Sequence, residues 1–128
     1  MTSLETGSIE RMGLVEQGRM FKTLLEEGAT VRELAHQMRM GTHAVEDAIE
    51  LADTPADLAP FLNNSFLDPA LALMLRRRYE GWVSGPYARH ALPIAQKMLA
   101  HARAERITMK TWRFLLDFYW PNDRPFLA

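Results

Sequence analysis

Three carboxylates and three arginines are the side chains of this sequence whose spacing indicates chemistry. Glu46, Asp47 and Glu50 follow one another closely, and residues 76–78 are three consecutive arginines. A carboxylate can accept a hydrogen bond from the N4 amino group of cytosine, and guanidinium groups bind phosphates. Carboxylates also repel phosphates, so the acidic cluster fits a protein partner as well as a base.

Each cluster also has an explanation that needs no ligand. Acids in the first turn of a helix interact favourably with the helix dipole, by ~0.3–1 kcal/mol each, and cations suit the last turn. The carboxylates would then form a solvated helix face, and the arginines would cap the end of their own helix.

The carboxylates must be positioned by the segment EEGATVRELAHQMRMGTHAVEDAIELADTP, residues 26–55, which predicts a helix, a turn and a second helix. Thr30 is a good N-terminal capping residue, with Glu33 three residues on as in a capping box. Gly41 makes the turn, and Thr42 can cap the helix that carries the carboxylates. The spacing predicts that the inward side chains of the two helices are Leu34, Ala35, Met38, Val45, Ala48, Ile49 and Ala52.

Apolar residues at helical spacing predict the remaining elements, and no stretch alternates with the period of a strand. Helices are expected from Leu14 to Gly28, as a short segment through Phe61 and Leu62, and from Pro69 to about Tyr79. A loop is expected over residues 81–86. A sixth helix, kinked or delayed by Pro93, should bury Tyr87, Ala91, Ile94, Ala95, Met98 and Ala102, and a seventh, capped by Thr108, should bury Trp112, Leu115, Leu116 and Tyr119. The sequence therefore predicts an all-α fold of about six to seven short helices, with a helix-turn-helix at residues 30–53.

Length and composition predict one compact domain. The chain has 128 residues, of which 48% are hydrophobic. We expect a flexible arm at residues 1–12, the domain at residues 13–120 and a tail at residues 121–128. The absence of cysteine, of a secretion signal and of a long apolar run indicates a cytoplasmic protein without a membrane segment.

Enzymatic chemistry is not indicated. His36, His43, His90 and His101 have no spacing typical of a metal site, and no phosphate-binding loop or nucleophile arrangement is present. We therefore expect no catalytic residues, no metal and no cofactor.

The two halves of the chain carry opposite charge. Residues 1–69 contain 5 Lys/Arg and 12 Asp/Glu, whereas residues 70–128 contain 10 Lys/Arg and 4 Asp/Glu. This asymmetry indicates that the ends meet different partners, that the acidic end of one molecule meets the basic end of another, or simply that two solvated faces differ in sign.

The stretch TVRELAHQMRMGTHAVEDAIELADTP resembles the helix-turn-helix of the ParB/KorB partition family. LVEQGRMFKTLLEEG is similar to the helix that leads into it, and ADLAPFLNNSFLDPALALML and AHARAERITMKTW are similar to segments that follow it. The resemblance runs through residues 14–113 and covers neither the family's nucleotide-binding domain nor its dimerisation domain. Arg39 stands where the family has Gly in the turn, so Arg39 must adopt an unfavourable backbone or the turn must be shifted.

The resemblance implies double-stranded DNA as a partner, in plasmid, phage or mobile-element partition or in transcriptional regulation. The side chains expected to face bases, because they begin the recognition helix, are Thr42, His43, Ala44, Glu46 and Asp47. Those expected to contact phosphates are Arg39, Arg76, Arg77, Arg78, Arg89, Lys97, Arg103 and Lys110.

Other partners are also expected. A homodimer is favoured because one helix in one groove gives little specificity. The aromatic end of the chain, with Tyr119, Trp120, Phe126 and Leu127, either folds back onto the core or docks on a second subunit. The alternative function is a protein-binding regulator, without enzymatic activity, that contacts its partner through the acidic third helix.

Overall fold

The computed structural model describes residues 11–65, 67–104 and 106–120, and over these residues it contains helices and loops but no strand. Residues 1–10 of the expected arm and the expected tail at residues 121–128 lie outside the described residues. The all-α prediction is confirmed. The helices are α2 (Leu14–Glu26), α3 (Val31–Met38), α4 (Thr42–Leu51), α5 (Ala59–Asn63), α6 (Pro69–Val83), α7 (Ala88–Ala104) and α8 (Met109–Tyr119).

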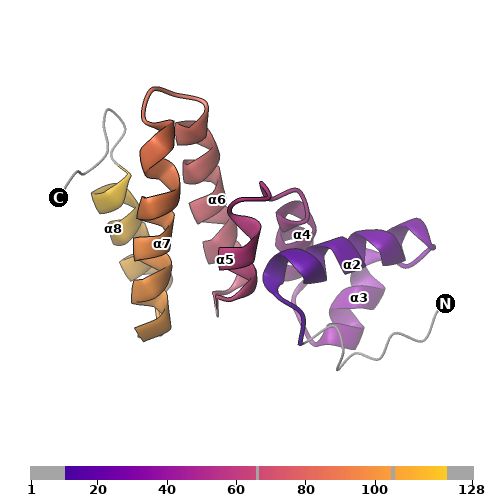
Figure 1. Ribbon diagram of the computed structural model, residues 1–128. Coiled ribbons are helices and arrows are strands. Elements are labelled where there is room, and N and C mark those ends of the chain that lie inside the picture. The colour runs from indigo at the N-terminus through magenta and orange to yellow at the C-terminus, as the bar shows by residue number, and fades with distance from the viewer. Residues whose placement is uncertain (1–10, 66, 105, 121–128) are drawn as a thin grey trace.

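Helices α2, α3 and α4 form a three-helix unit at one end of the molecule (Figure 1). Helix α3 begins as expected, because the Thr30 hydroxyl oxygen accepts a hydrogen bond from the Glu33 N–H at 3.1 Å. The core of this unit is built from side chains of all three helices. They are Phe21, Leu24, Leu34, Ala35, Met38, Val45 and Ala48.

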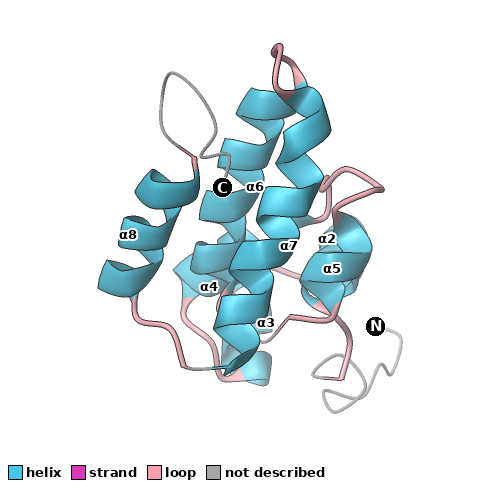
Figure 2. Cartoon of the chain, turned by 60° about the vertical axis from the view of Figure 1, so that its left-hand side comes forward, coloured by secondary structure: helices cyan, strands magenta, loops and turns pink. Residues whose placement is uncertain are grey.

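Helices α5 to α8 form a second, larger group, whose core also includes Val15 of α2 and Leu51 of α4 (Figure 2). Figure 1 shows α8 on the opposite side of the molecule from α2 and α3. Tyr79, Trp112 and Trp120 are the largest buried side chains of this group. The indole N–H of Trp112 donates to the Leu71 carbonyl at 2.9 Å, which satisfies the one polar group of this ring in the core. Trp120 is fully buried, so this residue folds onto the core.

The two groups are joined through α4, which packs against both α2 and α6. A second joint is made by Asn63 at the end of α5, whose Oδ1 accepts from the backbone N–H of Val15 at 2.9 Å and of Glu16 at 3.3 Å. These N–H groups have no partner within α2, because they belong to its first turn. Asn63 therefore caps a helix from which it is 48 residues distant.

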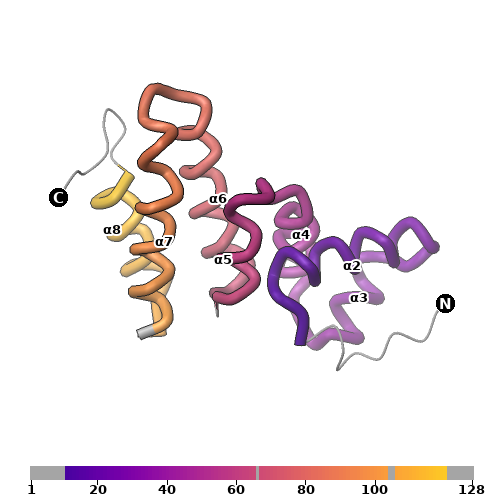
Figure 3. Tube along the Cα trace, in the orientation of Figure 1, coloured from indigo at the N-terminus to yellow at the C-terminus, as the bar shows by residue number. Residues whose placement is uncertain are grey.

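Three local predictions were wrong. Helix α6 continues past Tyr79 through Gly81 to Val83, where a loop was expected (Figure 3). The rings of Trp82 and Trp120 meet edge to face at 4.7 Å, and this contact stabilises a turn that glycine alone disfavours by about 1 kcal/mol. Tyr87 precedes α7 and is exposed, and Gly41, not Thr42, is the N-cap of α4.

Pro93 lies inside α7 without interrupting it. The inward side chains of α7 are otherwise those expected, with Ala91, Ala95 and Met98 fully buried. No helix within the described ranges combines the length and the apolar character that crossing a bilayer requires.

Candidate functional site

The turn between α3 and α4 is made by Arg39, Met40 and Gly41. Arg39 has φ 54° and ψ 43°, the left-handed conformation, and the Met40 N–H donates to the Ala35 carbonyl at 3.0 Å. This is the geometry of a helix end that normally selects glycine. Of the two expectations for Arg39, the unfavourable backbone is therefore the one observed, and its side chain is exposed beside the start of α4.

The first turns of α4 present a small polar surface. Thr42, His43 and Glu46 are exposed, whereas Ala44 and Asp47 are half-buried. Gly41 has no side chain that could accept from the first N–H groups of the helix. The positive end of the α4 dipole and its exposed hydroxyl and imidazole therefore meet at one point.

Two carboxylates near the C-terminal end of this helix, one of them just beyond it, pair with cations of the same chain. Arg77 Nη2 lies 3.4 Å from Oε2 of Glu50, and Lys22 Nζ lies 3.2 Å from Oδ1 of Asp53. Such exposed pairs contribute only about 0–1 kcal/mol to stability. They do reduce the negative charge of this end of the helix, and leave Glu46 and Asp47 as the acids nearest its start.

Asp47 differs from the other acids of α4 in its environment. Partial burial raises its pKa above the ordinary value of 3.8, and the neighbouring charge of Glu50 raises it further, while Arg77 and His43 act in the opposite direction. Asp47 is therefore protonated more readily than an exposed aspartate.

The three consecutive arginines of α6 point to different partners. Arg76 Nη1 donates to the backbone carbonyl of Glu50, and its Nε lies 2.6 Å from Glu80 Oε1 in an ion pair whose N–H is not aligned for a hydrogen bond. Its side chain is only 13% exposed. Arg78 donates to Asp117 Oδ1 at 2.8 Å and to the Trp120 carbonyl at 2.7 Å. Arg76 thus links α6 to α4, Arg78 links α6 to α8, and Arg77 is the most exposed of the three at 63%.

The remaining cations expected to bind phosphate lie on α7 and α8, away from α3 (Figure 1). Arg89 donates to His90 Nε2 at 3.4 Å, and Arg103 donates to the Asn64 carbonyl at 3.1 Å. Lys97 and Lys110 are exposed. The structure does not bring these four cations to the start of α4.

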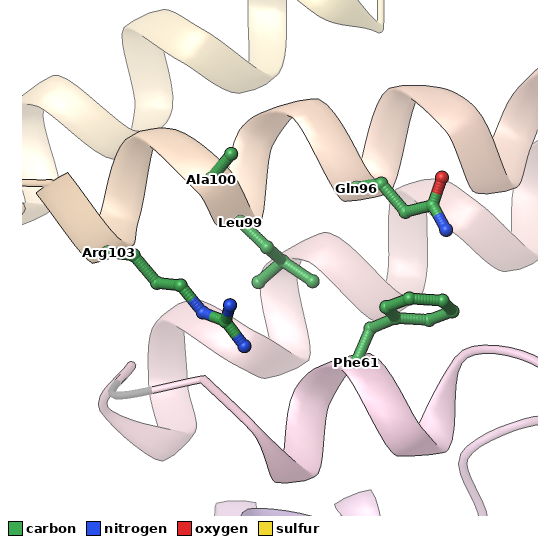
Figure 4. A pocket seen from close by; sticks show the side chains of 5 residues that line it. All are labelled: Phe61, Gln96, Leu99, Ala100 and Arg103. Atoms are coloured by element: carbon green, nitrogen blue, oxygen red, sulfur yellow. The ribbon is translucent and has the colours of Figure 1, made fainter.

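A pocket of about 320 Å³ lies beside Arg103, between α5 and α7 (Figure 4). Its other lining residues are Phe61, Gln96, Leu99 and Ala100. Its walls are mainly apolar, and Arg103 supplies its one charge. The pocket is therefore separate from the polar surface of α4.

Sequence reasoning missed the outward face of α8. Phe114 and Phe118 are 68% and 44% exposed, whereas Trp112 and Leu116, which periodicity predicts on this helix, face the core. The signal was present in the sequence, because positions 114 and 118 are one helical turn apart and lie on the side away from position 112.

Within the described ranges, no three side chains of His, Asp or Glu come close enough to hold a metal ion. Comparison of the chain with protein-family models, with curated proteins and with solved structures gave no match. The comparisons therefore assign no function to the chain.

Proposed function

We propose that the protein binds double-stranded DNA through the first turns of α4, in the partition or transcriptional control of a plasmid, phage or other mobile element. The observation that carries the proposal is the exposed start of α4, where Thr42 and His43 follow a tight three-residue turn from α3. A helix presented in this way can enter the major groove with its N-terminal side chains against base edges. The assignment to partition or transcriptional control comes from the resemblance of residues 30–55 to the ParB/KorB family.

Phosphate contacts come from the same place. The Arg39 guanidinium is exposed in the turn, and the first N–H groups of α4 lie at the positive end of its dipole. Arg76 and Arg78 already hold carbonyl and carboxylate oxygens, so Arg39 replaces them as the principal phosphate contact.

Two ion pairs within the protein reduce the repulsion between the acidic helix α4 and the phosphates of DNA. Glu50 and Asp53 are paired with Arg77 and Lys22, so repulsion comes mainly from Glu46 and Asp47. Glu46 is exposed beyond His43, where its carboxylate can accept from cytosine N4. Repulsion between Glu46 and phosphates lowers the affinity for DNA in general, while the contact with cytosine gives selectivity for one base.

The test is a fluorescence-anisotropy titration of the whole chain against a random-sequence duplex at low and moderate salt. Binding should weaken steeply with salt. Asn tolerates the left-handed conformation, so Arg39→Asn removes the charge without adding backbone strain. We expect this variant to bind more weakly to every sequence and to lower the slope of log K against log salt by about 1.

The matched control is Arg89→Asn, which removes an exposed arginine at the start of α7, away from α3 and the turn. It should leave affinity and salt slope unchanged. Equal losses in the two variants would show that the turn is not the site, and no binding at low salt would overturn the proposal.

A second candidate function is favoured by the charge that remains on α4. Glu46 and Asp47 give its exposed side an acidic surface suited to a basic protein partner, as a regulator would use. The double variant Glu46→Gln with Asp47→Asn distinguishes the two functions. Affinity for random DNA should rise if α4 meets phosphates, and binding to a basic partner protein should fall if α4 is a protein-facing surface.

A further inference from the structure

Helix α8 presents large apolar side chains to solvent. Of the six exposed large apolar side chains among the described residues, three lie on this helix: Met109 at 42%, Phe114 at 68% and Phe118 at 44%. The rings of Phe114 and Phe118 stack at 6.3 Å with an interplanar angle of 16°. The two rings therefore form one apolar ridge, which we call the α8 ridge, rather than scattered surface residues.

The ridge lies on a helix that is already well fixed. Trp112 and Leu116 bury the opposite side of α8, and Arg78 holds its C-terminal end through Asp117 and the Trp120 carbonyl. The ridge is thus held rigidly, and little conformational entropy is lost when a partner covers it.

The charged residues beside the ridge are separated by sign along the helix. Lys110 and Arg113 lie in its first half, and Asp117, the only carboxylate of α8, lies in its second half. Asp117 pairs with Arg78 of its own chain, but its side chain is 74% exposed, so a further cation can approach it. An antiparallel copy of α8 would bring Lys110 and Arg113 near the partner's Asp117 and the negative end of its helix dipole. A parallel copy would bring like charges together.

We propose that the α8 ridge is the contact surface of a symmetric homodimer, in which two copies of α8 pack antiparallel with Phe114 of each copy against Phe118 of the other. A two-fold interface requires a surface that complements itself, and the order of charges on α8 meets this requirement. Figure 1 shows α8 at the opposite end of the molecule from α2 and α3, so the proposed contact lies away from the turn between α3 and α4. The proposal does not depend on DNA binding, and its test contains no DNA.

Sedimentation equilibrium over a wide concentration range tests the interface with the whole chain. The wild type should reach twice the mass of 14.7 kDa. Phe114→Glu places a charge in the apolar contact and should weaken the dimer at least about tenfold, as expected for a buried aromatic anchor. Val83→Glu alters a similarly apolar exposed site on α6 and should leave the dimer unchanged.

Two results would overturn the proposal. One is a wild type that stays monomeric at every concentration, and the other is a dimer that Phe114→Glu and Val83→Glu weaken equally. If the wild type stays monomeric, a chain ending at Trp120 shows what covers the α8 ridge. If that shorter chain dimerises, residues 121–128 cover the ridge in place of a second copy.

The orientation is tested by cross-linking, since the chain has no cysteine of its own. A disulfide forms readily only when the two Cα atoms come within ~7 Å. In the antiparallel dimer, a mixture of Phe114→Cys and Phe118→Cys chains should cross-link to each other faster than either variant does alone. Faster self-linking of each variant would indicate parallel helices and contradict the proposal.

Discussion

The three-helix unit and the four-helix group bring their helices together in different ways. In the first, Gly18 of α2 lies against the backbone of α4, where an added Cβ would be 1.9 Å from the Ala48 carbonyl oxygen. In the second, Trp112, Trp120 and Tyr79 fill the space between helices. Small residues allow two backbones to approach closely, whereas aromatic rings hold helices apart and bury more area in one side chain.

Under the proposed function, the difference in packing corresponds to a difference in role. Close contact with α2 fixes α4, so that the start of α4 can be presented to a ligand while its other side packs on α6. The aromatic core of the four-helix group instead supplies stability and holds α8 with its outward ridge. The comparison predicts that the two regions respond differently to substitution.

The largest effect should come from the aromatic core. Trp112→Ala removes a fully buried ring and leaves the Leu71 carbonyl without its donor, and should lower the free energy of unfolding by about 3–5 kcal/mol. Urea unfolding measures the loss, and hydrogen exchange locates it. We expect faster exchange in α6 to α8 than in α3. Val83→Ala, at an exposed apolar position of α6, is the control and should change stability by less than about 0.5 kcal/mol. Equal acceleration in α3 would show that the two regions unfold as one.

The next effect tests the close approach of α2 and α4. Gly18→Ala should lower the free energy of unfolding by about 2–3 kcal/mol, because the new methyl group meets backbone that cannot rotate away. Gly81→Ala is the matched control, since a Cβ there meets open space inside α6. This control should stabilise the protein by about 0.5–1 kcal/mol through helix propensity. If both alanines stabilised the protein, the packing assigned to Gly18 would be wrong.

A smaller effect is expected at the joint between the regions. Arg76→Met keeps the side-chain stem but removes the donor to the Glu50 carbonyl at the end of α4, and should cost about 1–2 kcal/mol in thermal or urea unfolding. Arg77→Met removes the neighbouring, 63% exposed arginine and should cost about 0.5 kcal/mol or less. Similar losses for the two variants would contradict the distinct roles of these arginines.

Local signals in the sequence predicted much of this fold. Thr30, Pro69 and Thr108 mark helix starts because capping and the fixed φ of proline act within a few residues. Contacts across long separations could not be predicted. Arg77 and Glu50 are 27 residues apart, and nothing local to either residue specifies their pairing.

The candidate site divides in the same way. The exposed first turns of α4 follow from helical periodicity, so Thr42 and His43 were placed correctly on the surface. The basic residues could not be assigned to one surface, because three consecutive residues of a helix point about 100° apart and meet different neighbours. Arg76 and Arg78 illustrate this, since one is directed to α4 and the other to α8.

A still smaller effect, of opposite sign, is expected in the turn of the three-helix unit. Arg39→Gly relieves the left-handed conformation at φ 54° and should stabilise the protein by about 0.5–1 kcal/mol in urea unfolding. Under the proposed function the same variant should bind DNA more weakly, because it removes a phosphate contact. A variant that is more stable and binds equally well would remove Arg39 from the site.

The smallest effect concerns Asp47 on the exposed side of α4. Because the folded protein raises the pKa of this carboxyl, folding disfavours its charged form, and the resulting destabilisation is present at neutral pH. It disappears as the pH falls below the ordinary value of 3.8, where the group is protonated in both the folded and unfolded chains. Asp47→Asn should therefore raise the unfolding temperature slightly at neutral pH, by about 0.5 kcal/mol or less in stability, and lose this gain in acid. Glu46→Gln, at an exposed neighbouring carboxylate, is the control for the loss of one negative charge. A gain from Asp47→Asn that persisted in acid would show that a contact of the asparagine side chain, rather than the charge of Asp47, sets the stability of this part of α4.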